Sequence, residues 1–205
     1  MPRGFTEQER AEIRRGLLAA GREQFARFGL KRASIEELAR AAGIAKGSFY
    51  LFFDSKEALL FESLLEVEVE LRQELLRELD RPFASTKEFI VVLLTHQMDT
   101  LDRHPLVGVL NDPDAAIALM RAIPAETIHA AKESDEQFLR DVLGRHLRRG
   151  SALLKPARRR ILAALPRALY ALQLQRGLIG TDMRTFRRFL IESAAASLAA
   201  GSSLR

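Results

Sequence analysis

The sequence predicts an all-α protein of about nine helices. Apolar residues recur at intervals of three and four along most of the chain, and the alternation that marks strands is absent. Ser, Thr or Asp followed three residues later by Glu recurs as a helix-capping signature. The hydrophobic content of 47% over 205 residues is enough for a packed core. These observations together favour a globular helical fold.

The N-terminal part is expected to hold four helices, three of which open with a capping box. The first carries an apolar inner face that includes Leu17, Phe25 and Phe28, and Gly29 is placed to end it. The expected helices are residues 6–28, opened by Thr6 and Glu9; residues 34–42, opened by Ser34 and Glu37; a brief one from Lys46; and residues 54–79, opened by Asp54 and Glu57.

The rest of the chain is divided by prolines and glycines. Pro166 lies inside the pattern of one helix and predicts a kink near residues 162–166. The expected helices are residues 85–104, a region over 105–123 interrupted at 111–113, residues 124–149, a helix from Pro156 to Gly177 or Gly180, and residues 182–200.

Charge is unevenly distributed along the chain. Residues 1–56 hold 11 Lys and Arg against 7 Asp and Glu, a net of +4, whereas residues 57–80 hold eight carboxylates and two arginines. A basic segment suits phosphates and an acidic segment is repelled by them. We therefore expect one domain over residues 1–54 that suits an anionic partner and a second domain over residues 55–205.

Residues 34–53 have the form of a helix-turn-helix: "SIEELARAA", then "GIA", then "KGSFYLFF". Ala39 is small enough for close crossing, Gly43 suits the turn, and Phe49 with Phe53 are spaced to pack inward. The residues left on the outer side are Lys46, Gly47, Ser48, Tyr50 and Phe52.

The outward groups have the chemistry of a DNA-reading surface. Lys46 can reach guanine acceptors or a phosphate, Gly47 permits close approach, and Ser48 can bond either partner. Tyr50 offers a hydroxyl to a phosphate, and Lys56 adds a charge nearby. Double-stranded DNA is therefore the expected partner of this segment.

The run "SIEELARAAGIAKGSFYLFFDSKEALL" resembles the N-terminal signature of the TetR family of bacterial transcriptional regulators, over roughly residues 8–65. The resemblance implies a three-helix DNA-binding domain, a helical ligand-binding and dimerisation domain, and repression that a small molecule relieves. It carries DNA contacts onto Ser34, Lys46, Gly47, Ser48, Tyr50 and Lys56. A cytoplasmic homodimer is expected.

Two positions depart from the family pattern. Ala45 stands where the family often has Ser or Thr, so a cap and a possible phosphate contact are missing, at a cost of about 1 kcal/mol. Phe52 stands where Tyr or His is common, so it loses a polar contact to the DNA backbone but could lie against a thymine methyl or a sugar.

Beyond residue 65 the resemblance concerns the layout of helices. Apolar walls with a few polar groups are expected for the effector pocket. Candidate pocket residues are Phe61, Leu93, His96, Met120, Phe138, Tyr170 and Gln173. Candidate dimer residues on the last two helices are Leu162, Leu165, Leu169, Leu172, Phe186, Phe189, Leu190, Ala194, Ser197 and Leu198. The same stripes could instead pack within one subunit.

Other classes of function are disfavoured. The chain has no Gly-rich phosphate loop, no Gly-x-Ser-x-Gly elbow and no recognisable acid and base pair, so an enzyme is not expected. No cysteine is present and the four histidines are scattered, so neither a metal site nor a cofactor is expected. No apolar run is long enough to span a membrane. A basic segment, "RRGSALLKPARRR", is interpreted as an exposed helix end and loop. A regulator that is independent of ligand, or one that needs a corepressor, stays open as the alternative.

Overall fold

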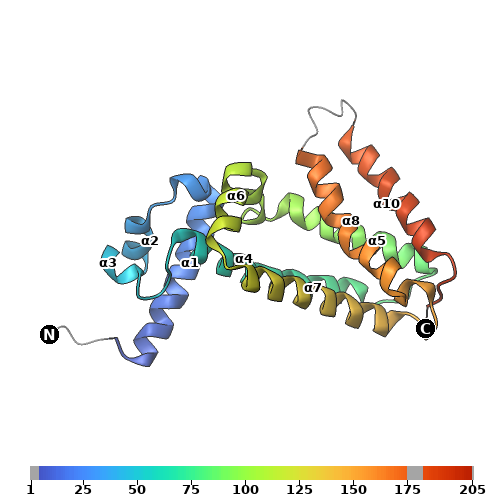
Figure 1. The fold of residues 1–205 in the computed structure, drawn as a ribbon, viewed down its shortest axis with the longest axis horizontal. Coiled ribbons are helices and arrows are strands. Elements are labelled where there is room, and N and C mark those ends of the chain that lie inside the picture. Colours follow the sequence, from blue (N-terminus) through green and yellow to red (C-terminus); the bar gives the residue numbers. More distant parts are fainter. Residues whose placement is uncertain (1–4, 175–181, 205) are drawn as a thin grey trace. The chain divides into compact units, whose positions relative to one another are not determined.

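The fold is helical throughout the described residues, 5–174 and 182–204 of a computed structural model (Figure 1). These residues form nine α-helices and two short 3-10 helices, so the predicted all-α fold of about nine helices is confirmed. The elements are α1 (Glu7–Arg32), α2 (Ile35–Ala41), α3 (Lys46–Phe49), α4 (Lys56–Leu79), α5 (Thr86–Arg103), η1 (Val107–Asn111), α6 (Pro113–Ala122), α7 (Ala125–His146), η2 (Ala152–Leu154), α8 (Pro156–Leu174) and α10 (Met183–Ala199).

Several predicted caps are present. The Thr6 hydroxyl accepts from the Glu9 backbone N–H at 3.2 Å, and the Glu9 carboxylate accepts from the Thr6 N–H at 2.7 Å. The Thr6 N–H and the Thr6 hydroxyl both donate to the Glu9 carboxylate, and these bonds to its ionised form lower the pKa of Glu9. At the start of α5 the Ser85 hydroxyl accepts from the Glu88 N–H at 3.1 Å. Local sequence therefore determines where these two helices begin.

Two of the predicted capping boxes are wrong. Ser34 precedes α2 in an extended conformation but its side chain makes no cap bond. At α4 the cap is Ser55 and not Asp54, because the Ser55 hydroxyl accepts from the Ala58 N–H at 3.1 Å. Asp54 lies one residue too early and is exposed. Asp and Ser are both good N-cap residues, so the sequence alone did not decide which of these two neighbours caps α4.

The chain forms two compact units. One is Met1–Glu70 with Arg103–Thr127, and the other is Leu71–Asp102 with Ile128–Arg205. The border between them falls inside α4, after Glu70, and the first unit also includes η1 and α6. The proposed functional division at residues 54 and 55 stays a prediction.

The first unit has its core behind the helix-turn-helix. Leu17 and Phe25 of α1 are fully buried, together with Leu59 of α4. Gly21 allows α1 to approach α4 closely, since a Cβ there would lie 3.1 Å from the Leu59 side chain. The prediction that Phe28 faces this core is wrong: its ring is 38% exposed and carries the Arg27 guanidinium 5.0 Å from its centroid.

Gly29 interrupts the first helix at the residue where the sequence predicted its end. It takes a left-handed φ of 73° with ψ of 170°, a conformation open to glycine, and the chain then regains helical structure to Arg32. The local break after Phe28 sends Leu30 and Ala33 into the core, where they are 3% and 5% exposed.

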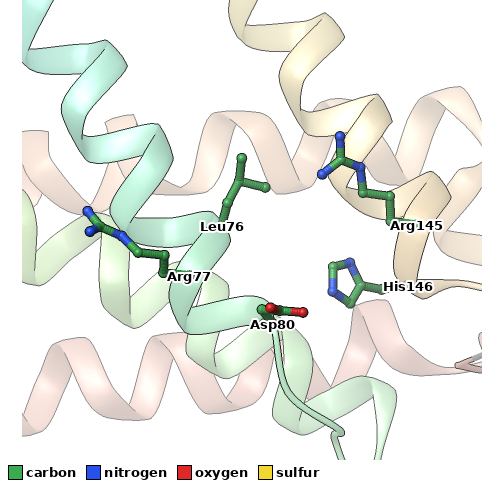
Figure 2. A pocket seen from close by; sticks show the side chains of 5 residues that line it. All are labelled: Leu76, Arg77, Asp80, Arg145 and His146. Carbon is green, nitrogen blue, oxygen red and sulfur yellow. The ribbon is translucent and has the colours of Figure 1, made fainter.

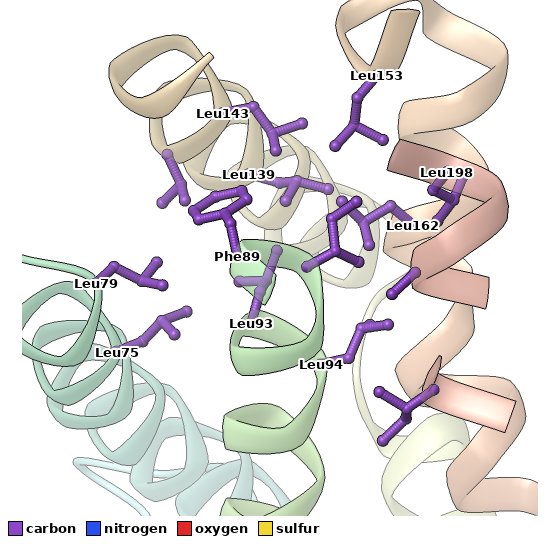
Figure 3. Close-up of a cluster of buried hydrophobic side chains, with 14 of the residues drawn as sticks. Leu75, Leu79, Phe89, Leu93, Leu94, Leu139, Leu143, Leu153, Leu162 and Leu198 are labelled. Atoms are coloured by element: carbon purple, nitrogen blue, oxygen red, sulfur yellow. The ribbon is translucent and has the colours of Figure 1, made fainter. Parts of the chain in front are cut away.

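The second unit is built around α5. Figure 3 shows α5 in the middle of an apolar cluster, with Phe89, Leu93 and Leu94 among side chains of α4, α7, α8 and α10. Phe89 is fully buried and stacks on the ring of His146 with centroids 4.9 Å apart. Burial of such large side chains is the main stabilising contribution to this unit.

The basic segment that follows α7 makes hydrogen bonds to the last residues of the chain. Arg148 donates from Nε to the Leu204 carbonyl at 2.8 Å, and Arg158 donates to the carbonyls of Leu198 and Ala200 near the end of α10. The Ser151 hydroxyl donates to the Ser203 carbonyl at 3.0 Å. Arg158 therefore compensates the end of α10. The segment is only in part the exposed helix end and loop expected from sequence, because Ser151 and Leu153 are buried.

Pro166 lies inside α8, which runs as one helix from Pro156 to Leu174. The kink predicted near residues 162–166 stays a prediction. Among the described residues no helix is long and apolar enough to cross a membrane.

Replacing Ser55 by Ala tests the cap of α4. The change removes the acceptor of the Ala58 N–H, and we expect the free energy of unfolding to fall by about 1 kcal/mol. Urea unfolding followed by circular dichroism measures it. Asp54→Ala is the matched control and should cost less than about 0.5 kcal/mol. A larger loss for Asp54→Ala than for Ser55→Ala would contradict this assignment.

Candidate DNA-binding interface

The turn between α2 and α3 has the geometry that the sequence predicted. Gly43 has φ of 72° with no atom within 4 Å of a Cβ built on it. The Gly43 N–H donates to the Arg40 carbonyl at 3.1 Å, and the Ile44 N–H donates to the Ala39 carbonyl at 3.0 Å. The left-handed glycine and these two bonds reverse the chain direction over a few residues.

Apolar side chains anchor α3 from behind. Phe49 is fully buried and Phe53 is 3% exposed, with their ring centroids 6.0 Å apart. On α2, Leu38 and Ala39 are fully buried, and Ala39 leaves room for the crossing helix. The inward orientation predicted for Phe49 and Phe53 is confirmed.

The opposite side of α3 faces solvent. Lys46 and Gly47 are exposed, Ser48 is half-buried and Tyr50 is 53% exposed. No atom lies within 4 Å of a Cβ built on Gly47, so a DNA backbone could approach it closely. Lys46 takes part in no ion pair among the described residues and keeps its ammonium available. Three members of the predicted outward set, Lys46, Gly47 and Tyr50, thus face solvent, whereas Ser48 is partly covered.

Two further predicted contacts flank this surface. Ser34 is half-buried, and its hydroxyl is not used as a cap, which leaves it able to meet a phosphate. Phe52 is half-buried, 5.9 Å from the ring of Phe5 and under the guanidinium of Arg10 at 5.4 Å. Contact of Phe52 with a thymine methyl or a sugar stays a prediction. Ala45 precedes α3 without a side-chain cap, as its sequence dictates.

Lys56 lies inside the domain's hydrogen-bond network. Its Nζ donates to the carbonyls of Leu30 at 2.8 Å, Lys31 at 3.2 Å and Ala33 at 3.3 Å. An ammonium has three donors, so this arrangement uses all of them. The phosphate contact assigned to Lys56 by resemblance stays untested, and the structure gives this side chain a different set of partners.

Arg10 and Arg14 were not selected from the sequence. They lie one turn apart on α1 and donate to the carbonyls of Leu51 at 3.2 Å and Phe52 at 3.3 Å, just after α3. Arg14 also pairs with Glu62 of α4. Their i, i+4 spacing on one helix face is a sequence signal, but carbonyl partners about 40 residues away cannot be read from it.

Arg22 gives α1 a further ion pair with α4. Arg22 makes a two-pronged bond to Glu70, with both N to O distances 2.7 Å, and lies 3.9 Å from Glu66. The hydrogen bond from Arg22 lowers the pKa of Glu70 and raises that of Arg22. Because these groups are substantially exposed, the pair contributes less than about 1 kcal/mol to stability.

The predicted pocket residues belong to both units. Phe61 is half-buried in the first unit and Met120 is 70% exposed on α6. In the second unit Leu93 is buried in the α5 cluster, and Phe138 lies under the Arg72 guanidinium at 5.0 Å. Tyr170 and Gln173 have side chains outside the described part. The exposure of Met120 argues against a lining role for it in this conformation.

Among the predicted pocket residues whose side chains the structure describes, His96 has unused hydrogen-bonding capacity. Its Nδ1 is paired with the Glu78 carboxylate of α4. Its Nε2 is buried and has no hydrogen-bond partner. A buried polar atom without a partner is costly, and a ligand group could satisfy it.

A hollow of about 440 Å³ lies elsewhere in the second unit (Figure 2). His146 bonds through Nδ1 to the Val142 carbonyl at 2.9 Å and through Nε2 to the Leu79 carbonyl at 3.1 Å. The residues lining the hollow are Leu76, Arg77, Asp80, Arg145 and His146, none of which was predicted as a pocket residue.

The predicted dimer residues divide into two groups. Leu162, Leu169 and Leu198 are buried within their own unit, so their role in this chain is intramolecular packing. Phe189 is 62% exposed on α10. The remaining members are half-buried or exposed, namely Leu165, Leu172, Phe186, Leu190, Ala194 and Ser197.

Comparison with known proteins gives matches of two kinds. Residues 17–62 match the family model described as bacterial regulatory proteins, tetR family. The uncharacterized HTH-type transcriptional regulator YdgC of Bacillus subtilis (strain 168) is 36% identical over 62 residues, which cover 30% of this chain and 32% of that protein. The sequence match therefore spans about a third of the relative's length.

Solved structures match over nearly the whole chain. A TetR transcriptional regulator from Rhodococcus sp. RHA1 aligns with a TM-score of 0.61 and 19% identity, covering 94% of this chain and 97% of that one. The transcriptional regulator FadR of Bacillus subtilis, in complex with stearoyl-CoA, aligns with a TM-score of 0.56 and 17% identity, covering 91% and 98%. At these identities the likeness shows a shared fold.

Proposed function

We propose that this chain, whose N-terminal segment belongs to the TetR family of bacterial regulatory proteins, is a dimeric repressor that binds a near-palindromic operator and is released by a small apolar or amphipathic effector. The relatives it matches are transcriptional regulators and not enzymes, as expected from sequence. The observation that carries the proposal is the solvent-facing side of α3, whose polar groups are held outward by the buried Phe49.

The α3 surface supports DNA recognition through complementary groups. The Lys46 ammonium suits guanine O6 and N7 or a phosphate, and the Ser48 hydroxyl can donate or accept. Tyr50, exposed at the end of α3, can donate to a phosphate oxygen. Two copies of α3 about 34 to 36 Å apart would read successive turns of the major groove.

Dimerisation is supported by the surfaces of α8 and α10. These helices pack side by side in the second unit (Figure 1). Each exposes a large apolar side chain, Ile161 at 53% and Phe189 at 62%. Exposed apolar side chains on a helix pair favour association, and a twofold axis would bury both copies in a four-helix arrangement.

Effector binding is supported by His96. Its buried Nε2 has no hydrogen-bond partner, and His96 lies one turn along α5 from Leu93 of the apolar cluster. A ligand with an apolar body and one hydrogen-bonding group would satisfy this atom. The fold shared with FadR, which was solved with stearoyl-CoA, is consistent with a ligand of this character. Since Leu93 is packed in this conformation, effector binding would favour a different arrangement of the helices.

α4 is the element through which an effector could act on DNA binding. Its first part is joined to α1 by Arg14 with Glu62 and by Arg22 with Glu70. Its last part belongs to the second unit, where Arg72 donates to Ser134 and Asp135 of α7 at 3.0 Å. A shift of α4 would therefore move α1, and with it the carbonyl anchors of α3. The effector must bind the arrangement that fits the operator poorly.

A second candidate is a regulator that needs no effector, or that needs a corepressor. The burial of Leu93 and the exposure of Met120 favour it. Operator affinity measured with and without effector distinguishes the two candidates, because an inducer lowers it, a corepressor raises it and an independent regulator shows no change.

Replacing Lys46 or Tyr50 by Ala tests the DNA-reading surface. Each change removes a proposed DNA contact and should weaken operator binding by about 1 to 3 kcal/mol. The operator is first obtained by selection from randomised duplex DNA, and affinities are measured by fluorescence anisotropy. Lys132→Ala, an exposed lysine of α7, serves as the control. Unchanged affinity in both variants would remove the assignment.

Replacing Phe189 by Asp tests the dimer. A carboxylate at the centre of the proposed apolar contact cannot be buried without a partner, so we expect a monomer at micromolar concentration by analytical ultracentrifugation. The matched control is Ile117→Asp, because Ile117 is also apolar and 48% exposed but lies on α6. A Phe189→Asp protein that stays dimeric would place the interface elsewhere.

Replacing His96 by Leu tests the effector site. Fatty acids and acyl-CoAs of increasing chain length are titrated against the protein–operator complex, and release is followed by anisotropy. Loss of the Nε2 contact should raise the effector concentration needed for release about tenfold. His129→Leu, at an exposed histidine of α7, should behave as the wild type. Equal release of both variants would exclude His96 from the site.

A further inference from the structure

Lys56 joins the first turn of α4 to the end of α1. Its ammonium lies 2.8 Å from the Leu30 carbonyl oxygen, 3.2 Å from that of Lys31 and 3.3 Å from that of Ala33. An ammonium carries three N–H donors and no acceptor, so three carbonyls saturate it. A phosphate contact by Lys56 would require it to release at least one of these partners.

The carbonyls that Lys56 binds have few alternatives. The last carbonyls of a helix lack intrahelical donors and carry the negative end of the helix dipole. Leu30 and Ala33 are themselves 3% and 5% exposed, so water has limited access around this turn. The irregular backbone at Gly29 adds to the need for an external donor here. Lys56 supplies that donor together with a compensating positive charge.

The position of this junction matters for DNA recognition. Ala33 is followed directly by Ser34, the residue that precedes α2, and α2 packs against α3 in the helix-turn-helix. At the other end of the motif, Arg10 and Arg14 donate to the carbonyls of Leu51 and Phe52. Cations therefore bind backbone carbonyls at both ends of the helix-turn-helix.

We propose that Lys56 is a positioning residue for operator binding, which fixes the α1–α2 junction through three backbone carbonyls and does not contact a DNA phosphate. This inference rests on the proposed DNA-binding function. It also separates Lys56 from Lys46, which is exposed on α3 with its ammonium available to DNA. Lys46 then contributes to operator binding by contacting DNA, and Lys56 contributes by holding the protein backbone in place.

The salt dependence of operator binding distinguishes a phosphate contact from a positioning role. A lysine that neutralises a phosphate releases counterions, so its loss reduces the slope of log K against log salt by about 0.9 in each subunit. A positioning residue releases none, and its loss leaves the slope unchanged. Lys56→Met keeps the length of the aliphatic chain and removes the donors, and Lys46→Met is the matched control.

We expect Lys56→Met to lower operator affinity about tenfold, as for lost hydrogen bonds to a charged group, with the wild-type salt slope. Lys46→Met should lower both the affinity and the slope. Affinities are compared at a temperature where circular dichroism shows every protein fully folded, so that a loss of global stability alone cannot change them. A reduced slope in Lys56→Met, or an unchanged affinity, would overturn the proposal.

Lys56→Arg gives an independent answer, and it replaces Lys56→Met if that variant does not fold. Arginine keeps the charge needed by a phosphate, but its planar, longer group cannot donate to three carbonyls that converge on one ammonium. We expect weaker operator binding with an unchanged slope. Wild-type affinity in Lys56→Arg would favour a phosphate contact and contradict the proposal.

Hydrogen exchange distinguishes failure of this inference from failure of the proposed function. In the absence of DNA, the variant should show faster amide exchange over residues 30–38 than the wild type, because the junction has lost its donor. If the wild type binds no selected DNA but this exchange increases, the proposed function fails and the role of Lys56 in holding the junction stands. Unchanged exchange would remove that role.

Discussion

The first unit depends on the burial of Phe49. α3 is four residues long, and a helix of this length has no stability of its own in water. It is held because α3 packs on α2, Phe49 is fully buried, and Phe53 packs against Phe49. Everything that α3 can present to DNA follows from this anchor. With Phe49 inside, Lys46, Gly47 and Tyr50 must lie on the solvent side.

Several positively charged side chains of the first unit bind groups of the protein itself. Residues 1–56 hold a net charge of +4, which by itself suggests a uniform attraction for DNA. In the structure, Arg10, Arg14 and Lys56 bind backbone carbonyls, and Arg22 binds Glu70. Several of these cations thus hold the domain together and are less available to phosphates. Net charge counted from sequence overstates the charge offered to a nucleic acid for this reason.

The second unit shows what apolar periodicity in the sequence can predict and what it cannot. The apolar spacing of α5 predicted a buried helix, and Phe89, Leu93 and Leu94 are indeed within the core. The same reasoning did not identify which faces stay open. Leu162, Leu169 and Leu198 were placed in a dimer interface, yet they pack within their own unit, while Phe189 remains exposed. A stripe of leucines has the same pattern whether its partner helix belongs to the same chain or to another.

The sequence by itself determined the all-α class, the helix-turn-helix and the division of α3 into a buried and an exposed side. These features arise from local periodicity and turn chemistry, which act between residues a few positions apart. Only the tertiary structure decided that Ser55 and not Asp54 caps α4, that Phe28 is exposed, and that Lys56 reaches the carbonyls of α1. The Ser55 cap is a choice between two neighbouring residues that both suit the role, and its partner Ala58 lies nearby in the chain. The Lys56 contacts instead join residues more than 20 positions apart, and local spacing carries no information about which distant segments meet.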